Sequence, residues 1–229
     1  MDYEKRLQEI RSQIAQACSR VGRDPADVTI VAVTKYIDTA QTEAVVRAGL
    51  TDIGENRLQV ALPKMEGMAP ELQEQVRWHY IGSLQTKKVK DVLQRFDWIH
   101  SVDRSSLALE IQKRAASIGR PVPCLVQVNV SGEESKSGFA PEEVPSFLQE
   151  AQGLDFVDIR GFMTMAPAST NPEDARPVFR GLRELRDNMI AQGWLPASAR
   201  ELSMGMSGDY SVAVEEGATL VRLGSVLVK

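Results

Sequence analysis

A lysine stands directly after the first apolar run of the chain, and its position suggests amine chemistry. The run spans residues 28–34 and is rich in β-branched side chains, which predicts a buried strand that ends at Lys35. At the mouth of a core, partial desolvation favours the neutral form of an amine, and a neutral lysine can form a Schiff base. The alternative is a strand-ending lysine whose ammonium group reaches solvent.

Two turns rich in glycine and serine could bind a phosphate group. Ser207 and Gly208 follow the seventh predicted strand, and Gly224 and Ser225 end the eighth. Free backbone N–H groups at such turns bind anions, and many β/α barrels hold phosphate after strands seven and eight. We also expect Ser207 to be the N-cap of the helix that follows it. Taken singly, each turn could be only a cap or a turn.

Together these groups suit pyridoxal 5′-phosphate (PLP). This cofactor needs an amine for its aldehyde, an anchor for its phosphate and a group that faces its pyridine nitrogen. Lys35 and the two turns would supply the first two. Arg222, in the last predicted strand, would supply the third if its side chain points inward. Because a guanidinium keeps its proton in proteins, it would leave the ring nitrogen unprotonated and restrict carbanion chemistry.

Strand-like and helical patterns alternate along the whole chain, and this alternation must position those groups. The predicted strands are 28–34, 51–54, 78–82, 98–102, 122–130, 157–164, 201–204 and 220–224. The predicted helices between them are 39–48, 55–66, 84–95, 104–119, 141–152, 173–193 and 208–217. Such alternation favours a parallel sheet with both faces covered. Eight strands match a single (β/α)8 TIM-type barrel, and a doubly wound open sheet is the alternative.

The N-terminal residues favour the barrel. Residues 1–22 have the apolar spacing of an amphipathic helix with interspersed charges, which is unlike a signal peptide. Because the chain stops shortly after its last strand, this helix could take the place of a missing final helix. We find no linker or internal repeat, and we therefore expect residues 1–229 to form one domain.

Composition excludes several classes of protein. The chain has 229 residues, 43% hydrophobic and 25% charged, with a formal net charge of −4. These values are typical of a globular protein and favour neither nucleic acid nor an anionic membrane as a partner. Two lone cysteines, Cys18 and Cys124, exclude a disulfide framework. The two histidines, His79 and His100, lack ligands at metal spacing, so we expect them to be packed or hydrogen-bonded and expect no metal. The expected compartment is the cytoplasm.

Seven ordered segments of the chain match a known family. They are Ala32–Lys35, Asp52–Gln59, Trp78–Lys88, Asn129–Gly138, Arg160–Met163, Glu201–Ser207 and Val221–Ser225. On these residues, which span almost the whole chain, the protein resembles the YggS/PROSC family of PLP homeostasis proteins. One segment departs from the family's pattern, because Lys87 stands where the family usually has an asparagine. Any role of that asparagine therefore does not carry over.

The resemblance implies a PLP-bearing barrel like the N-terminal domain of alanine racemase. In that scheme Lys35 forms the aldimine with PLP and Arg222 faces the pyridine nitrogen. The implied cofactor-binding residues are Lys35, Asn56, Met163, Ser207, Gly208, Arg222, Gly224 and Ser225. Asn56 and Met163 would line the pocket, and the residues of the two turns would hold the phosphate. The expected function is to bind, store or hand over PLP, with an influence on vitamin B6 and amino-acid pools.

The alternative function is that of a PLP-dependent amino-acid racemase. Racemases of this type have two domains, and the second domain of a partner subunit supplies a tyrosine as the second acid or base. We expect no such second domain after residue 229. Without it, an acid–base contribution of about 10²–10⁴ in rate is missing. We therefore expect no catalytic residue and no robust catalysis, with a weak racemase-like side activity left open.

The remaining expectations concern partners. Lys87, Lys88, Lys90 and Arg95 could suggest RNA binding, but in an acidic chain they are more typical of a solvated helix face. The expected partners are PLP and the apo-enzymes that accept it. We expect a monomer or a weak dimer.

Overall fold

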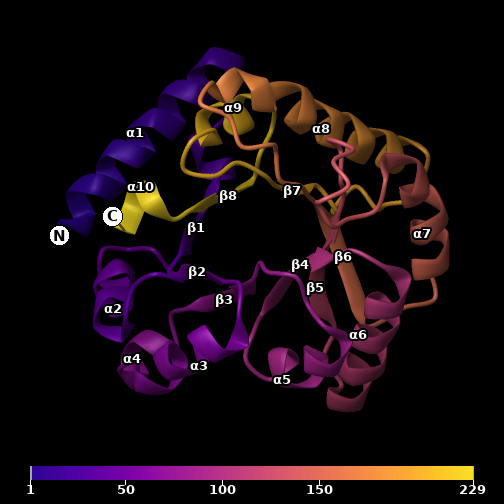
Figure 1. Cartoon of the computed structure of the whole chain (residues 1–229), viewed down its shortest axis with the longest axis horizontal. Helices are drawn as coiled ribbons and strands as arrows, with labels where there is room; N and C mark the ends of the chain where they lie inside the picture. The colour runs from indigo at the N-terminus through magenta and orange to yellow at the C-terminus, as the bar shows by residue number, and fades with distance from the viewer. Residues whose placement is uncertain (1, 229) are drawn as a thin grey trace.

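Eight parallel strands form a closed barrel in the computed structural model, which describes residues 2–228 (Figure 1). Strands that follow each other in sequence pair side by side, and the last pairs with the first, so the sheet has no free edge. The predicted (β/α)8 barrel is confirmed, and the open sheet is wrong. The strands are β1 (Thr29–Val33), β2 (Asp52–Glu55), β3 (Arg77–Tyr80), β4 (Trp98–Val102), β5 (Val122–Gln127), β6 (Val157–Met163), β7 (Glu201–Ser203) and β8 (Leu220–Leu223).

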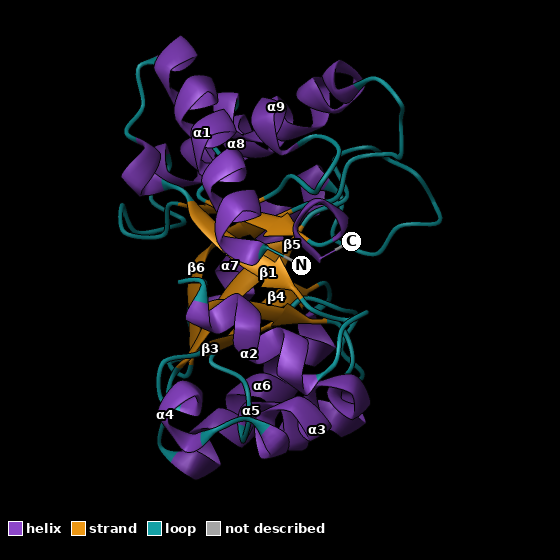
Figure 2. Ribbon diagram, turned by 90° about the vertical axis from the view of Figure 1, so that its left-hand side faces the viewer, coloured by secondary structure: helices purple, strands orange, loops and turns teal. Residues whose placement is uncertain are grey.

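Helices follow the strands and enclose the barrel, as Figure 2 shows. They are α1 (Tyr3–Val21), α2 (Thr39–Arg47), α3 (Leu58–Gly67), α4 (Pro70–Gln73), α5 (Val89–Leu93), α6 (Ser105–Ile118), α7 (Val144–Ala151), α8 (Arg176–Ala191), α9 (Tyr210–Glu215) and α10 (Ser225–Val228). No helix between residues 2 and 228 has the length and apolar character needed to cross a membrane.

The first helix lies against the last two. α1 contacts α9 and α10, and Figure 1 shows the indigo and yellow ends of the chain side by side. The buried face of α1 includes Leu7, Ile10 and Ile14, spaced as an amphipathic helix requires. Tyr210 of α9 donates a hydrogen bond to Gln13 of α1 over 2.5 Å. α1 therefore covers the barrel beside α10, which is only four residues long.

Several predicted boundaries are wrong, among them those of three elements near the site and the loops. β5 ends at Gln127 instead of residue 130, because Asn129 turns away and its N–H donates to the carbonyl of Phe139. The predicted helix 84–95 is a 3-10 turn (Thr86–Lys88) followed by α5. α9 begins at Tyr210, two residues later than predicted, and its N-cap is Asp209. Ser207 is therefore not the N-cap of this helix.

Because successive side chains of a strand point to opposite faces of the sheet, the barrel has two apolar cores. One lies between the barrel and its helices and includes Cys18 and Cys124, which are buried free thiols. The other is a small cluster inside the barrel. It consists of Val31, Leu125, Met163 and Leu220, with Trp98 and Met165 packed against it.

A bulge in β6 decides which of its side chains enter the barrel. Cys124 of β5 pairs with Ile159, but the next residue, Leu125, pairs with Gly161, so β6 carries one extra residue. Gly161 has a φ of +143°, a conformation that side chains rarely adopt. Beyond the bulge Phe162 packs toward the helices, and the residue after it faces the interior. The bulge thus sets the face of every residue that β6 sends toward the C-terminal opening.

We predict that Gly161→Ala strongly destabilises the protein. A methyl group there would overlap the backbone of Glu201 in β7, and the positive φ adds strain. The free energy of unfolding should fall by at least about 2 kcal/mol, measured by urea titration. Gly153→Ala is the matched control, because a methyl group there meets no heavy atom within 4 Å. Equal stabilities of the two variants would show that the bulge does not require glycine.

Candidate functional site

A cavity of about 590 Å³ opens at the C-terminal ends of the strands, where reactive groups gather in β/α barrels. Its walls come from several strand ends along the chain, including those of β1 and β8, which closure places side by side. Seven of the eight predicted site residues line it: Lys35, Asn56, Ser207, Gly208, Arg222, Gly224 and Ser225. Their joint placement was expected from the strand ends, whereas their role in binding a cofactor stays a prediction.

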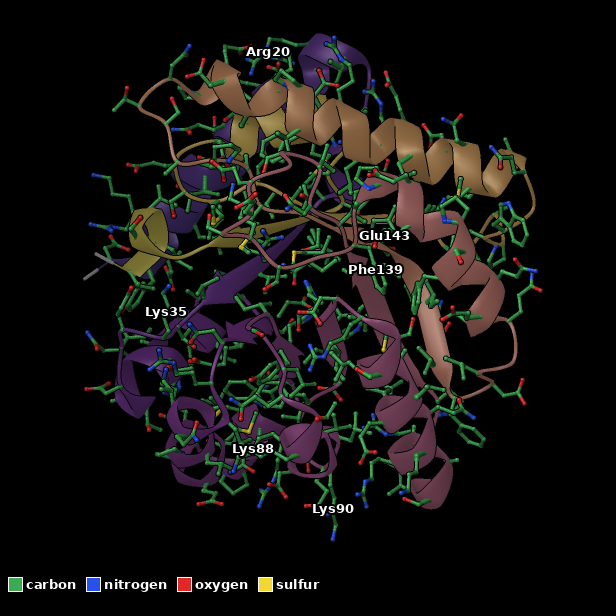
Figure 3. The ribbon with its side chains drawn as sticks, turned by 45° about the vertical axis from the view of Figure 1, so that its right-hand side comes forward. Arg20, Lys35, Lys88, Lys90, Phe139 and Glu143 are labelled. Carbon is green, nitrogen blue, oxygen red and sulfur yellow. The ribbon has the colours of Figure 1, made fainter. Side chains whose placement is uncertain are left out.

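Lys35 stands in a tight turn between β1 and α2 (Figure 3). The turn closes where the N–H of Ile37 donates to the carbonyl of Thr34 over 3.0 Å. Asp38 then caps α2 in a reciprocal pair of hydrogen bonds with Gln41. Lys35 is half-buried, as expected, and its Nζ lies 4.8 Å from the centre of the Tyr36 ring. The lysine therefore has a fixed backbone and an amine at the cavity wall.

A buried ion pair stabilises this turn through the carbonyl of Thr34. Lys64 Nζ lies 2.5 Å from Glu55 Oε1 and donates to the carbonyl of Thr34 over 2.5 Å. The Thr34 hydroxyl donates to the same carboxylate oxygen over 2.6 Å. Both charges are almost fully buried, and removing one partner of such a pair typically costs about 3–5 kcal/mol. The pair fixes the carbonyl that immediately precedes the site lysine.

Arg222 is a buried cation at the floor of the cavity. Its side chain is held by two acceptors: Nη1 donates to Ser203 Oγ over 2.7 Å, and Nη2 donates to the carbonyl of Thr164 over 2.9 Å. Burial lowers the pKa of Arg222 to about 10, while the carboxylate of Asp209 opposes the shift. The guanidinium therefore remains charged at neutral pH. A guanidinium has five N–H donors, so the hydrogen bonds to Ser203 and Thr164 leave further N–H groups available to a ligand.

The two small-residue turns meet at one hydroxyl. Ser207 Oγ accepts hydrogen bonds from the N–H groups of Gly224 and Val226, each over 3.2 Å. This cross-link replaces the N-cap role predicted for Ser207, and it leaves the hydroxyl proton free to be donated. Within residues 2–228, the backbone N–H groups of Ser207, Gly208 and Ser225 have no acceptor in the protein. The turns therefore present a group of unpaired donors, which suits an anion.

Asn56 reaches the cavity from the end of β2, beside the loop that follows β3. Gly82 of that loop lies so close to the backbone of Asn56 that a methyl group at 82 would overlap its carbonyl oxygen. Only glycine permits this approach. The two loops therefore form one continuous part of the cavity wall.

Met163 is the one predicted site residue outside the cavity lining. Its side chain is 1% exposed and lies in the apolar cluster inside the barrel. Met165, two residues further along the chain, lines the cavity instead. Side chains two residues apart in a strand face the same way, so the later one lies nearer the C-terminal opening. The predicted pocket position is therefore corrected from 163 to 165.

The barrel interior beneath Arg222 is polar. His79 and His100 are buried and hydrogen-bonded to each other, as expected for histidines without metal ligands. Burial, and the proximity of His79 and Arg222 to any positive charge on this ring, lower the pKa of His100 well below its ordinary value. Although burial alone would raise it, hydrogen bonds from His79 and Arg77 hold the pKa of Asp52 below its usual range. His100 is therefore a neutral imidazole at neutral pH.

Several residues that support the site were not predicted from the sequence. Ser203 and Thr164 hold Arg222, and Lys64 supports the turn of the site lysine. Ser203 could have been found, because it is a polar residue at an inward position of an apolar strand. Lys64 lies on a helix surface in the sequence pattern, and only the tertiary packing of α3 against β1 reveals its burial.

Known proteins resemble the chain over nearly its full length. Residues 6–229 match the family model of the alanine racemase N-terminal domain. A pyridoxal phosphate homeostasis protein from Aquifex aeolicus is 41% identical, over 97% of this chain and 96% of that protein. One from Pseudomonas aeruginosa is 37% identical, over 96% and 92%.

Solved structures show the same likeness. PipY of Synechococcus elongatus PCC7942, solved with PLP bound, has 32% sequence identity and a TM-score of 0.85 over the whole of both chains. An alanine racemase from Clostridium difficile 630 has 15% identity and a TM-score of 0.74, over 97% of this chain and 56% of that one. The likeness to the racemase is one of fold.

We predict that the stability of the protein falls as the pH drops below about 6.5. The pKa of His100 is lower in the native state than the ordinary 6.5, so below that pH the unfolded chain binds a proton that the native state does not. The free energy of unfolding should then decrease by up to about 1.4 kcal/mol per pH unit through this residue. Urea titrations between pH 5.5 and 7.5 measure the slope. His100→Asn should flatten it, and an unchanged slope would contradict the assignment.

Proposed function

The chain belongs to the family of pyridoxal phosphate homeostasis proteins, and we propose that it binds PLP at Lys35 and supplies the cofactor to other proteins. The observation that carries this proposal is the composition of one cavity. A half-buried amine, a buried guanidinium with spare donors and a group of unpaired backbone N–H groups line the same space. The named relatives and the PLP-bound PipY structure support it.

The donors of the cavity fit the acceptors of PLP. Ser207, Gly208 and Ser225 offer N–H groups and hydroxyls at the two turns, which suits a phosphate dianion. Arg222 offers N–H groups from the floor, which suits a ring nitrogen with a lone pair. When bound, PLP supplies an aldehyde carbon that an amine can attack. Lys35 provides that amine, and Asn56 and Met165 are among the residues that form the other walls.

The residues of the cavity favour storage of PLP over rapid catalysis. Arg222 remains charged at neutral pH, so it donates a hydrogen bond without giving up a proton, and an unprotonated ring withdraws electrons weakly. Among the described residues, no carboxylate, histidine or cysteine lines the cavity. Rapid proton transfer needs a second positioned acid or base, worth about 10²–10⁴ in rate. We therefore propose no catalytic residue and no metal.

A racemase-like activity is the second candidate. The observation that favours it is Tyr36, a residue that is 68% exposed, lines the cavity and has the amine of Lys35 over its ring. A phenol in this place could act as the second acid or base. It is carried on a surface turn, however, and is largely exposed to solvent, whereas Arg222 is buried.

Delivery of PLP implies partners and a compartment. We propose that residues 1–229 act as one PLP-binding unit, as a monomer or weak dimer in the cytoplasm, and that apo-enzymes accept the cofactor. The chain offers no helix suited to spanning a membrane within residues 2–228. Lys87, Lys90 and Arg95 are exposed around α5, and Figure 3 shows Lys90 pointing away from the protein, as on a solvated face.

We predict that Lys35→Ala abolishes covalent attachment of PLP. The protein is incubated with PLP, reduced with borohydride and digested, and the phosphopyridoxyl mass is located by mass spectrometry. It should lie on the peptide that contains Lys35 and vanish in the variant. Lys88→Ala is the control, since Lys88 lines a neighbouring groove but not this cavity. Undiminished labelling of the Lys35→Ala variant would refute the assignment.

We also predict transfer of the cofactor without rapid turnover. PLP-loaded protein is mixed with the apo form of an aminotransferase, and the return of aminotransferase activity is followed together with the loss of bound PLP from the carrier. Polarimetry with free amino acids tests the alternative in parallel. Fast racemisation that requires Lys35, without transfer, would favour an enzyme over a carrier. Tyr36→Phe should leave transfer unchanged, whereas a racemase would lose its second acid or base.

A further inference from the structure

A continuous row of hydrogen-bonded side chains runs through the barrel and ends at Arg222. Asp52 Oδ1 lies 2.8 Å from His79 Nε2, and His79 Nδ1 lies 2.9 Å from His100 Nε2. His100 Nδ1 lies 2.9 Å from Ser203 Oγ, which accepts from Arg222. Each of these residues is at most 7% exposed. The proposed binding of PLP uses neither histidine, yet both stand in this row.

The row joins the two ends of the barrel. Asp52 is the first residue of β2 and lines a second cavity of about 520 Å³ at the N-terminal ends of the strands. There the exposed Arg77 donates to its other carboxylate oxygen over 2.8 Å. Arg222 stands at the opposite end, on the floor of the PLP cavity. The row therefore has an anion at one end and a cation at the other.

Donor and acceptor requirements give the row a single direction. A guanidinium can only donate, so Ser203 Oγ must accept from Arg222. His100 and Arg222 are the only partners of Ser203 Oγ among the described residues. If His100 donated to it as well, the buried hydroxyl proton would have no acceptor, which is costly. Ser203 must therefore donate to His100 Nδ1.

The remaining protons follow from that step. A neutral His100 with a bare Nδ1 carries its proton on Nε2 and donates it to His79 Nδ1. His79 then carries its own proton on Nε2 and donates it to the carboxylate of Asp52. If His79 instead carried a proton on Nδ1, one of two things would follow. Either Nε2 would also be protonated and the ring would be cationic, or the lone pair of Nε2 would face the carboxylate of Asp52. Every hydrogen bond in the row thus points from Arg222 toward Asp52.

We propose that Asp52, His79, His100 and Ser203 form a one-way hydrogen-bond wire that positions Arg222 against the ring of PLP. The two histidines are positioning residues, both neutral and protonated on Nε2. The negative charge of Asp52 polarises each bond in turn and makes Ser203 a stronger acceptor for the guanidinium. With Nη1 held by Ser203 and Nη2 by Thr164, the plane of Arg222 is fixed. The positioning role rests on the proposed binding of PLP, whereas the wire does not.

The wire is tested first in the wild-type chain, which contains two histidines. A long-range ¹H–¹⁵N correlation spectrum at pH 7.5, without added PLP, reports the protonation of all four ring nitrogens. Both rings should show a protonated Nε2 and a bare Nδ1. A ring protonated on Nδ1, or a doubly protonated ring, would overturn the one-way wire. Because this measurement needs no cofactor, its result is independent of whether PLP binds.

The effect on Arg222 is tested with His79→Leu, which interrupts the wire three hydrogen bonds away from Arg222. PLP should leave this variant about fivefold faster than the wild type, because one hydrogen bond to the guanidinium is weakened. The absorbance maximum of the bound cofactor should also shift. Leu125→Val, a change in the apolar interior of the barrel, is the control and should retain the wild-type rate. If His79→Leu keeps the wild-type rate and spectrum, the positioning role is wrong. If it does not fold, His100→Asn serves as the second interruption.

Discussion

Closure of the sheet is the constraint on which the rest of the structure depends. A closed parallel barrel has no edge, so every second side chain of each strand must fit into one narrow interior. Four apolar residues fill part of that space, and a polar row from Asp52 to Arg222 occupies another part of it. Closure also brings β8 beside β1, which places the arginine and the two turns next to the site lysine. The cavity is therefore a consequence of the barrel.

The polar part of the interior is stable because its requirements are met almost completely. A buried guanidinium needs acceptors, and neighbouring strands provide a hydroxyl and a carbonyl. The histidines satisfy each other, and Asp52 is paired with both His79 and Arg77. The same side chains that allow Arg222 to be buried hold it in a defined orientation. Stability of the barrel and geometry of the site are thus not separable here.

The sequence revealed the strands and their ends, because apolar runs and turn residues are local signals. Lys35, Arg222 and the two turns could be named for that reason. The bulge at Gly161 is not a local signal, since it depends on the backbone of a neighbouring strand. For this reason the residue on the cavity wall is Met165, and Met163 belongs to the interior. The predicted role of Ser207 as the N-cap of the helix that follows it is wrong, because its actual partners, Gly224 and Val226, are distant in sequence.

The cross-link through Ser207 bears on reversibility. Its hydroxyl joins the loops after β7 and β8 through protein groups alone, so the scaffold around the anion site is assembled before any ligand arrives. The buried pair of Glu55 and Lys64 does the same for the turn of the lysine. A protein that repeatedly takes up and releases a small molecule benefits from such preassembly, since little conformational entropy is lost or regained in each cycle. The cavity therefore keeps the same shape before a ligand binds and after it leaves.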